Sequence, residues 1–430
     1  MYCFNCGKQI NEKDRFCPYC AVFINILSQP GPQQKTYPRS TAGYPSPAAN
    51  RPEQPPAPKK KSGGKRARRV FAVLLILLIA AGIYFFFFVK TSLDTAPKVR
   101  TNRRGPGYHS PVVLNIPFSS GNSTDNPGLG TGLGRRDDTK YTFLILAVDE
   151  GGGNTDVIMT ASFDTAKHKF EVVNIPRDTL SNVSWNSIKK ANSIYANMRQ
   201  KHGWDERSLS AGMDAVVELF ADIIGYEVDY WAIVDMKAFV RLVDAIDGVD
   251  FNVPVDMHYV DEPAGLYIDY ASGMQHLNGK QALEVVRFRS GYSNADIGRI
   301  NTQQEFLMSA VKQIMEKRSS LNITELAKIF LKDVKTNLKL DDLIWFGNEF
   351  LKMNADSVHF QTLPANYWDS VRGQSYVTIY TDEWLKMVDE FLSPFKDATT
   401  PEKVSILTRD SGGRLYVTDG NHRGDPSWGS

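Results

Sequence analysis

Residues 141–148 read YTFLILAV, a mostly apolar run of strand length. Two similar runs follow, VIMTASFD (157–164) and KFEVVNIP (169–176), and the turn-like TAKH (165–168) joins them. Short apolar runs bounded by turn residues are typical of buried strands. We therefore expect order to start near residue 141 with a strand, followed by a second and a third strand joined by a turn.

Helical spacing of apolar residues begins after these strands. The predicted helices are LSAGMDAVVELFADIIG (209–225), FVRLVDAI (239–246), INTQQEFLMSAVKQIMEK (300–317), ITELAKIFLKDV (323–334), DDLIWFGNEFLKM (341–353) and TDEWLKMVDEFL (381–392). Further strands are predicted at DYWAIVD (229–235), VDFNVPV (249–255) and VHFQTLP (358–364). Strands that alternate with helices predict an α/β fold, here a layered α-β-α domain with a central mixed sheet.

A second long apolar run, VFAVLLILLIAAGIYFFFFV (70–89), contains no charged residue. A helix of 20 residues spans about 30 Å, the thickness of a bilayer core, so we expect a single transmembrane helix. Seven basic residues precede it: Lys59, Lys60, Lys61, Lys65, Arg66, Arg68 and Arg69. Such a cluster could bind nucleic acid, but beside an apolar span it favours a cytoplasmic N-terminus and an extracytoplasmic main domain.

The rest of the chain is net negative once this cluster is set aside, since the whole carries only +2, so no nucleic-acid partner is expected. The predicted organisation has six parts. They are a head (1–20), a Pro-rich linker with the basic cluster (21–69), the membrane helix (70–89), an extracytoplasmic linker (90–138), the main domain (139–395) and a loose polar tail (396–430).

The four cysteines of the chain are confined to the head, at Cys3, Cys6, Cys17 and Cys20. Two close C-x-x-C pairs supply the four thiolates of a tetrahedral zinc site, so a small zinc-ribbon-like head is predicted. Two disulfides or a redox-active dithiol are the alternatives, and a cytoplasmic location disfavours the disulfides. The head has the size of a docking or sensing module.

Two carboxylates flank a glycine-rich loop in the main domain. Asp149 ends the first strand and Asp156 opens the second, in VDEGGGNTD (148–156). Ligands bind at strand carboxyl ends in α/β sheets, and oxygen donors near phosphate suit Mg²⁺. The alternative is a solvated turn with ordinary acidic residues.

Basic side chains recur near predicted strand and helix ends. Arg177 lies in NIPRDT, Arg287 and Arg289 lie two apart in VVRFRS, and Arg299 and Gln303 lie four apart in GRINTQQ. An extended VVRFRS would point its two arginines to one side, and a helix would place Arg299 and Gln303 on one face. Guanidinium groups bind phosphate oxygens in pairs of hydrogen bonds, although any single arginine is more often a surface ion-pair partner.

These motifs together resemble the LytR–CpsA–Psr family of cell-wall polymer ligases over residues 141 to 310. The matching pieces are LAVD, TDVIM, VVNIPRDT, KKANSIYA, WAIVDMKAFVRLVDAIDGVDFNVP, GMQHLNGKQALEVVRFR and DIGRINTQQEF. The resemblance implies a phosphotransferase (EC 2.7.8) that moves an anionic glycopolymer, such as teichoic acid or capsule, from polyprenyl pyrophosphate to peptidoglycan with Mg²⁺. It also implies an apolar pocket for the lipid chain.

The resemblance further implies roles for individual residues. Arg177, Arg287, Arg289 and Arg299 would bind the pyrophosphate as catalytic residues, Lys190 and Gln303 would contact substrate, and Asp149 and Asp156 would hold Mg²⁺. Two departures from the family pattern stand out, since the loop EGGGNT lacks an arginine and Thr302 replaces a frequent basic residue. They keep an alternative open, a non-catalytic regulator that binds lipid-linked intermediates and signals through its zinc head to a cytoplasmic partner.

Overall fold

The computed structural model describes residues 95–97, 99, 136–149, 153–185, 187–203, 205–262, 266–290, 292, 296–424 and 428. The cysteine head and the apolar run at 70–89 lie outside these residues, as does most of both linkers. Within the described part of the chain, no helix combines the length and the apolar character of a membrane span.

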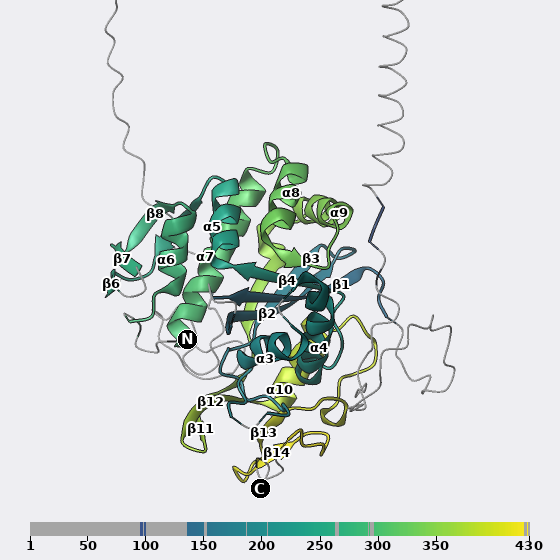
Figure 1. The fold of residues 1–430 in the computed structure, drawn as a ribbon. Helices are drawn as coiled ribbons and strands as arrows, with labels where there is room; N and C mark the ends of the chain where they lie inside the picture. Colours follow the sequence, from purple (N-terminus) through teal and green to yellow (C-terminus); the bar gives the residue numbers. More distant parts are fainter. Residues whose placement is uncertain are drawn as a thin grey trace, which may run out of the picture. The chain divides into compact units, whose positions relative to one another are not determined.

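A six-stranded mixed sheet forms the centre of the domain, as the alternation of strands and helices predicts (Figure 1). In spatial order its strands are β10 (Val358–Thr362), β3 (Lys169–Asn174), β2 (Thr155–Asp164), β1 (Lys140–Val148), β4 (Tyr230–Asp235) and β9 (Lys335–Thr336). β2 runs antiparallel to β1 and β3, whereas β4 runs parallel to β1 and β10 runs parallel to β3. The carboxyl ends of β1, β3, β4 and β10 therefore lie at one edge.

Helices cover both faces of this sheet (Figure 1). One layer contains α3 (Ser193–His202), α4 (Glu206–Ile224) and α10 (Thr381–Met387), and a π-helical turn (Val388–Leu392) extends α10. The other contains α5 (Met236–Ala245), α6 (Gly279–Arg287), α7 (Asp296–Glu316), α8 (Ile323–Asp333) and α9 (Leu340–Leu351). The expected layered α-β-α architecture is confirmed.

The side-chain alternation of β1 explains the two layers. Leu144 and Leu146 are fully buried among apolar residues of α3, α4 and α10, whereas Tyr141 and Phe143 pack on the other face against Phe346 of α9. Tyr141 and Phe143 meet the Phe346 ring edge-on, at centroid distances of 5.0 and 5.3 Å. A strand with apolar residues on both faces can only be buried between two layers.

The ends of α4 follow from local chemistry. The Asp205 side chain accepts a hydrogen bond from the Ser208 amide at 2.9 Å and so caps the first turn. Gly225 ends the helix with φ +86°, a conformation that glycine adopts without steric cost. A Cβ atom at Gly225 would also lie 2.4 Å from the Thr399 side chain, so this end of α4 packs tightly against the chain beyond α10.

Two small antiparallel two-stranded sheets extend the layer of α5, α6 and α7. β5 (Val249–Val253) pairs with β8 (Gly273–Leu277), and β6 (Met257–Asp261) pairs with β7 (Leu266–Tyr270). Two more lie beyond β10, namely β11 (Ala365–Val371) with β12 (Gln374–Ile379) and β13 (Leu407–Arg409) with β14 (Leu415–Val417). The described residues also contain 3₁₀ turns at Ala355–Ser357 and Pro401–Lys403.

The expected loose tail from residue 396 is wrong for the described residues of that segment. Leu407, Val417 and Trp428 are each less than 5% exposed and share one apolar cluster with Tyr376 of β12. The segment was difficult to recognise because β13 and β14 contain only three residues each, too few for an alternation pattern to emerge.

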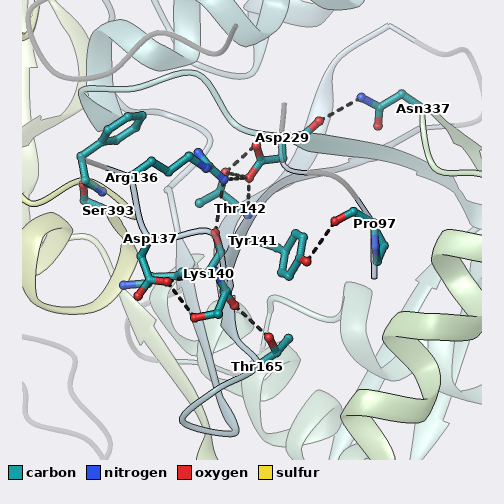
Figure 2. A network of polar contacts seen from close by, with 12 residues as sticks. Pro97, Arg136, Asp137, Lys140, Tyr141, Thr142, Thr165, Asp229, Asn337 and Ser393 are labelled. Carbon is teal, nitrogen blue, oxygen red and sulfur yellow. Dashed lines mark hydrogen bonds and ion pairs between the residues drawn. The ribbon is translucent and has the colours of Figure 1, made fainter. Parts of the chain in front are cut away.

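A buried carboxylate fixes the start of the sheet (Figure 2). Asp229 is fully buried and accepts hydrogen bonds from the Thr142 amide at 2.9 Å and the Thr142 hydroxyl at 2.8 Å. The Arg136 guanidinium forms an ion pair with the same carboxylate and donates to the Lys140 carbonyl at 3.2 Å. This network joins the segment entering the domain to β1 and β4.

Candidate functional site

A β-bulge sets the position of Asp156. Ala147 pairs with Val157 and the next residue of β1, Val148, pairs with Thr155, so Asp156 is the extra residue on β2. Bulges remove one residue from the alternation of a strand and redirect its side chain. Asp156 is consequently 41% exposed, whereas Thr155 before it is buried. Asp149 follows β1 directly, at the same edge of the sheet.

Arg177 binds the Asp156 carboxylate. After β3 ends, the Ile175 amide donates to the Ile158 carbonyl at 2.8 Å, which keeps the chain beside β2. Arg177 Nη1 then reaches Asp156 Oδ1 at 2.8 Å, with the Arg177 side chain 21% exposed. Arg177 therefore lies beside Asp156 at the same end of the sheet.

A short antiparallel ladder, which we call the site ladder (residues 177–181 and 189–192), supports Arg177. The Asn192 amide donates to the Arg177 carbonyl at 2.9 Å, and the Ala191 amide donates to the Thr179 carbonyl at 2.8 Å. The Thr155 amide donates to the Asn192 carbonyl at 3.2 Å. The site ladder is thus bonded to the residue that precedes Asp156.

The site ladder also carries Lys190. Its Nζ lies 3.0 Å from Asp178 Oδ1 and 5.4 Å from the centre of the Tyr376 ring on β12. The hydroxyl of Tyr376 accepts a hydrogen bond from the Lys189 amide at 3.3 Å, and burial raises the pKa of Tyr376. Asp178 and Tyr376 were not predicted from sequence, because their part in the site depends on contacts between distant segments.

The VVRFRS segment differs from the expected extended conformation. α6 continues through Arg287, and only then does Phe288 turn the backbone to φ −62° and ψ 137°. Arg289 follows in the exposed turn, where its Nη2 lies 3.7 Å from Asp156 Oδ1. Arg289 and Arg177 therefore approach one carboxylate oxygen from two different elements, while Arg287 is half-buried at the end of α6.

α7 presents the remaining predicted residues. Arg299 is 3% exposed in its first turns, and Gln303 lies one turn later, where its Nε2 donates to the Val286 carbonyl at 3.1 Å. Residues four apart share a helix face, so Arg299 also faces the end of α6. Thr302 is buried and bonds internally, with its hydroxyl 3.0 Å from the Gly298 carbonyl and 2.6 Å from the Tyr292 hydroxyl.

The two carboxylates fit a magnesium site in their chemistry. Asp149 Oδ1 accepts from the Gly153 amide at 3.0 Å, and Asp156 Oδ1 meets both arginines. Among described residues, the Oδ2 atom of neither carboxylate accepts a hydrogen bond, which leaves one oxygen of each for a cation. The described chain also groups no three His, Cys, Asp or Glu side chains into a metal site. One or two carboxylates completed by water and phosphate are typical of Mg²⁺.

The predicted zinc ligands Cys3, Cys6, Cys17 and Cys20 lie outside the described residues. The zinc-ribbon-like head therefore stays a prediction.

The fold and this edge together define a layered α/β protein in which carboxylates and arginines from separate elements converge at one end of a mixed sheet. The chain belongs to the LytR_cpsA_psr family, whose model matches residues 117–391. That match covers more than half of the chain and includes every residue of the candidate site.

Curated relatives share this domain. The chain is 29% identical over 255 residues to the cell wall biosynthesis protein LcpA of Corynebacterium glutamicum, covering 55% of this chain and 48% of LcpA. It is 25% identical over 234 residues to the regulatory protein MsrR of Staphylococcus aureus, covering 53% and 66%. It is 25% identical over 196 residues to the polyisoprenyl-teichoic acid–peptidoglycan teichoic acid transferase TagV of Bacillus subtilis, covering 44% and 46%. The matches thus span about half to two thirds of these relatives.

Solved structures of similar proteins include TagV from B. subtilis, with a TM-score of 0.47 at 19% identity over 59% of this chain and 97% of that one. A LytR-Csp2A-Psr enzyme from Actinomyces oris gives a TM-score of 0.46 at 18% identity over 61% and 94%.

Proposed function

We propose that this protein is a membrane-anchored phosphotransferase that moves an anionic glycopolymer from a polyprenyl pyrophosphate carrier to peptidoglycan. Family membership supports the proposal, as do the names of two relatives, a cell wall biosynthesis protein and a teichoic acid transferase that acts on peptidoglycan. In this proposal the run at 70–89 anchors the chain, with the N-terminus in the cytoplasm and the main domain outside.

One observation carries the proposal: Asp156 holds two arginines from separate elements at the carboxyl edge of the sheet. This carboxylate accepts a hydrogen bond from Arg177 and forms an ion pair with Arg289, so it occupies the position that we assign to phosphate oxygens. Arginine forks bind both groups with the same geometry. All three side chains are at least 21% exposed, so a ligand arriving from solvent could reach them.

The chemistry assigned to the site is the transfer of one phosphoryl group. A peptidoglycan hydroxyl oxygen attacks the phosphorus that carries the glycan, and a new P–O ester bond forms. The P–O bond to the second phosphate breaks, polyprenyl monophosphate leaves with the electron pair, and the hydroxyl proton is released. Negative charge grows on the phosphoryl and leaving oxygens, so cationic groups placed there in advance lower the barrier.

Each predicted residue has a part in this proposal. Arg177 and Arg289 bind the pyrophosphate after exchanging Asp156 for phosphate oxygens, and Arg287 and Arg299 add positive charge from α6 and α7. Lys190 reaches the substrate from the site ladder, and Gln303 holds α7 against the end of α6 through its bond to the Val286 carbonyl. These four arginines and Lys190 would supply the positive charge for phosphate binding, since the loop EGGGNT contains no arginine.

Asp149 and Asp156 would hold Mg²⁺, which when bound supplies positive charge against the phosphate oxygens. Apolar side chains of the helical layers would receive the polyprenyl chain, as the family resemblance implies.

A direct transfer assay tests the proposal. The full chain in detergent would receive a polyprenyl-pyrophosphate-linked glycan, peptidoglycan and Mg²⁺, and the peptidoglycan-bound product would be measured. We expect transfer by the wild type and at least a hundredfold loss in Arg299→Ala with folding retained. Arg318→Ala is the matched control, because Arg318 is exposed just beyond the end of α7 and lies outside the candidate site. A wild type that neither binds the carrier nor forms product would overturn the proposal.

The name of MsrR, a regulatory protein, favours a second candidate, a lipid-intermediate-binding regulator that signals through the zinc head. Deletion of residues 1–58 separates the two candidates. A transferase keeps its activity without the head, whereas a regulator of this kind loses its effect in cells.

A further inference from the structure

We propose that the C-terminal strap, defined as residues 404–424 with Trp428, is a positioning element that holds the site ladder so that Lys190 faces the phosphate-binding edge. The proposal rests on the proposed function, because it assigns the strap a part in binding the same pyrophosphate. The strap lies beyond residues 117–391, which the family model matches.

The strap is anchored to the domain on both sides. The Ser405 amide donates to the Asp222 carbonyl of α4 at 2.9 Å, and the Thr408 hydroxyl donates to the Ile379 carbonyl of β12 at 2.6 Å. Near its end, Arg423 Nη1 lies 2.8 Å from Asp222 Oδ2 in a largely buried ion pair. The strap therefore has fixed positions at its beginning and at its end.

Between these anchors the strap bonds to the far end of the site ladder. Asn182 follows the first ladder strand, and its Nδ2 donates to the Ser405 hydroxyl and to the Asn421 carbonyl, both at 2.8 Å. The Arg423 amide donates in return to Asn182 Oδ1 at 2.9 Å. Asn182 is 5% exposed, so its amide group is paired with strap atoms at a buried contact.

Lys189 forms the second contact between strap and site ladder. It is 1% exposed, and its ammonium group donates to the Val183 carbonyl and, at 3.2 Å, to the Arg423 carbonyl. It also lies 5.3 Å from the centre of a Trp428 ring. A buried ammonium needs such acceptors because the loss of hydration is costly. The strap thus supplies part of the environment that lets Lys189 stay buried.

The link from Lys189 to the site follows from strand geometry. Consecutive side chains of an extended segment point to opposite sides, so burying Lys189 under the strap directs Lys190 the other way. Lys190 there meets Asp178 and the Tyr376 ring. Tyr376 in turn packs edge-on against Trp428, with ring centroids 6.2 Å apart. Trp428 therefore contacts Lys189, the residue before Lys190, and Tyr376, the ring that Lys190 meets.

The test uses geranylgeranyl pyrophosphate as a probe and measures its binding to the full chain by calorimetry. We expect Trp428→Ala to weaken binding at least tenfold, since small misplacements of binding groups cost up to about a hundredfold. Trp428→Phe, which keeps a ring over Lys189, should stay within threefold of the wild type. Trp368→Ala is the control, because Trp368 is 72% exposed on β11 and should leave binding within twofold.

A double-mutant cycle distinguishes positioning from general destabilisation. If the strap acts through Lys190, Trp428→Ala should have no further effect in a Lys190→Gln background. Equal losses in both backgrounds would overturn the proposal, as would a folded Trp428→Ala variant that binds within twofold of the wild type. If Trp428→Ala fails to fold, Lys189→Met replaces it. This variant should also weaken probe binding at least tenfold in the wild-type background and have no further effect in the Lys190→Gln background, and the contrary results would overturn the proposal. A wild type that does not bind the probe would instead refute the proposed function.

Discussion

Removal of Arg136 offers a quantitative test of how the sheet is held at its start. Asp229 is fully buried, and Arg136 is the cation that pairs with it in the network of Figure 2. In an Arg136→Met variant the carboxylate keeps the two hydrogen bonds from Thr142 but loses its charge partner.

The expected cost is large because a charge stays buried. Removing one partner of a buried ion pair destabilises proteins by about 3–5 kcal/mol. Since the two Thr142 hydrogen bonds still compensate part of the charge on Asp229, we expect about 3 kcal/mol. For a domain of this size that corresponds to a fall in Tm of roughly 6–12 °C.

Thermal unfolding followed by circular dichroism measures the effect. Arg414→Met is the matched control, because the exposed Arg414–Asp410 pair should contribute at most about 1 kcal/mol. The double variant Arg136→Met/Asp229→Asn should recover part of the loss, since it no longer buries a carboxylate. The reasoning would be refuted if Arg136→Met lowered Tm no more than Arg414→Met, or if the double variant were less stable than the single one.

Three further predictions concern pH and the site. The hydrogen bond that protonated His359 donates to Glu171 raises the pKa of His359. The stabilisation from this contact is therefore complete below pH 6.5 and is lost as pH rises through the raised pKa. His359→Gln should flatten the dependence of Tm on pH between pH 6 and 9. Burial raises the pKa of Asp222 to about 7, although Arg423 acts in the opposite direction. The protein should therefore lose stability as pH rises from about 4 to about 7, because the buried carboxyl group ionises over this range. Asp222→Asn should remove this slope when Tm is measured at a series of pH values. Arg289→Ala should weaken geranylgeranyl pyrophosphate binding about tenfold in calorimetry and shift Tm by less than 1 °C, because its side chain is 43% exposed; a larger shift in Tm would contradict a role confined to binding.

The sequence pattern predicted those strands of the central sheet well that have apolar side chains buried on both faces. The run 141–148 reads as a strand in sequence and is one, because residues such as Leu144 and Phe143 each face an apolar layer. The helices α8 and α9 begin and end within a few residues of their predicted bounds. The spacing of apolar residues was sufficient to predict these elements, because each element packs one face against the core along its whole length.

The predictions failed where a distant contact or a cap decides the structure. Nothing in TDVIM indicates that Asp156 is a bulge, because the bulge exists only in the pairing with β1. The extended reading of VVRFRS missed that Asn278 and Gln281 form a reciprocal capping box, which starts α6 early enough to run through Arg287. The strap was missed for a similar reason, since its burial depends on the site ladder and α4.

The bulge at Asp156 has a consequence for how such a protein can change over generations. Asp156 stands outside the alternation of β2, and its side chain is 41% exposed rather than buried with the apolar residues of the strand. Substitutions at Asp156 can change which ligand the site binds without changing the hydrophobic core, and substitutions in the core can change stability without changing Asp156. Ligand preference and stability can therefore evolve separately in this part of the sheet.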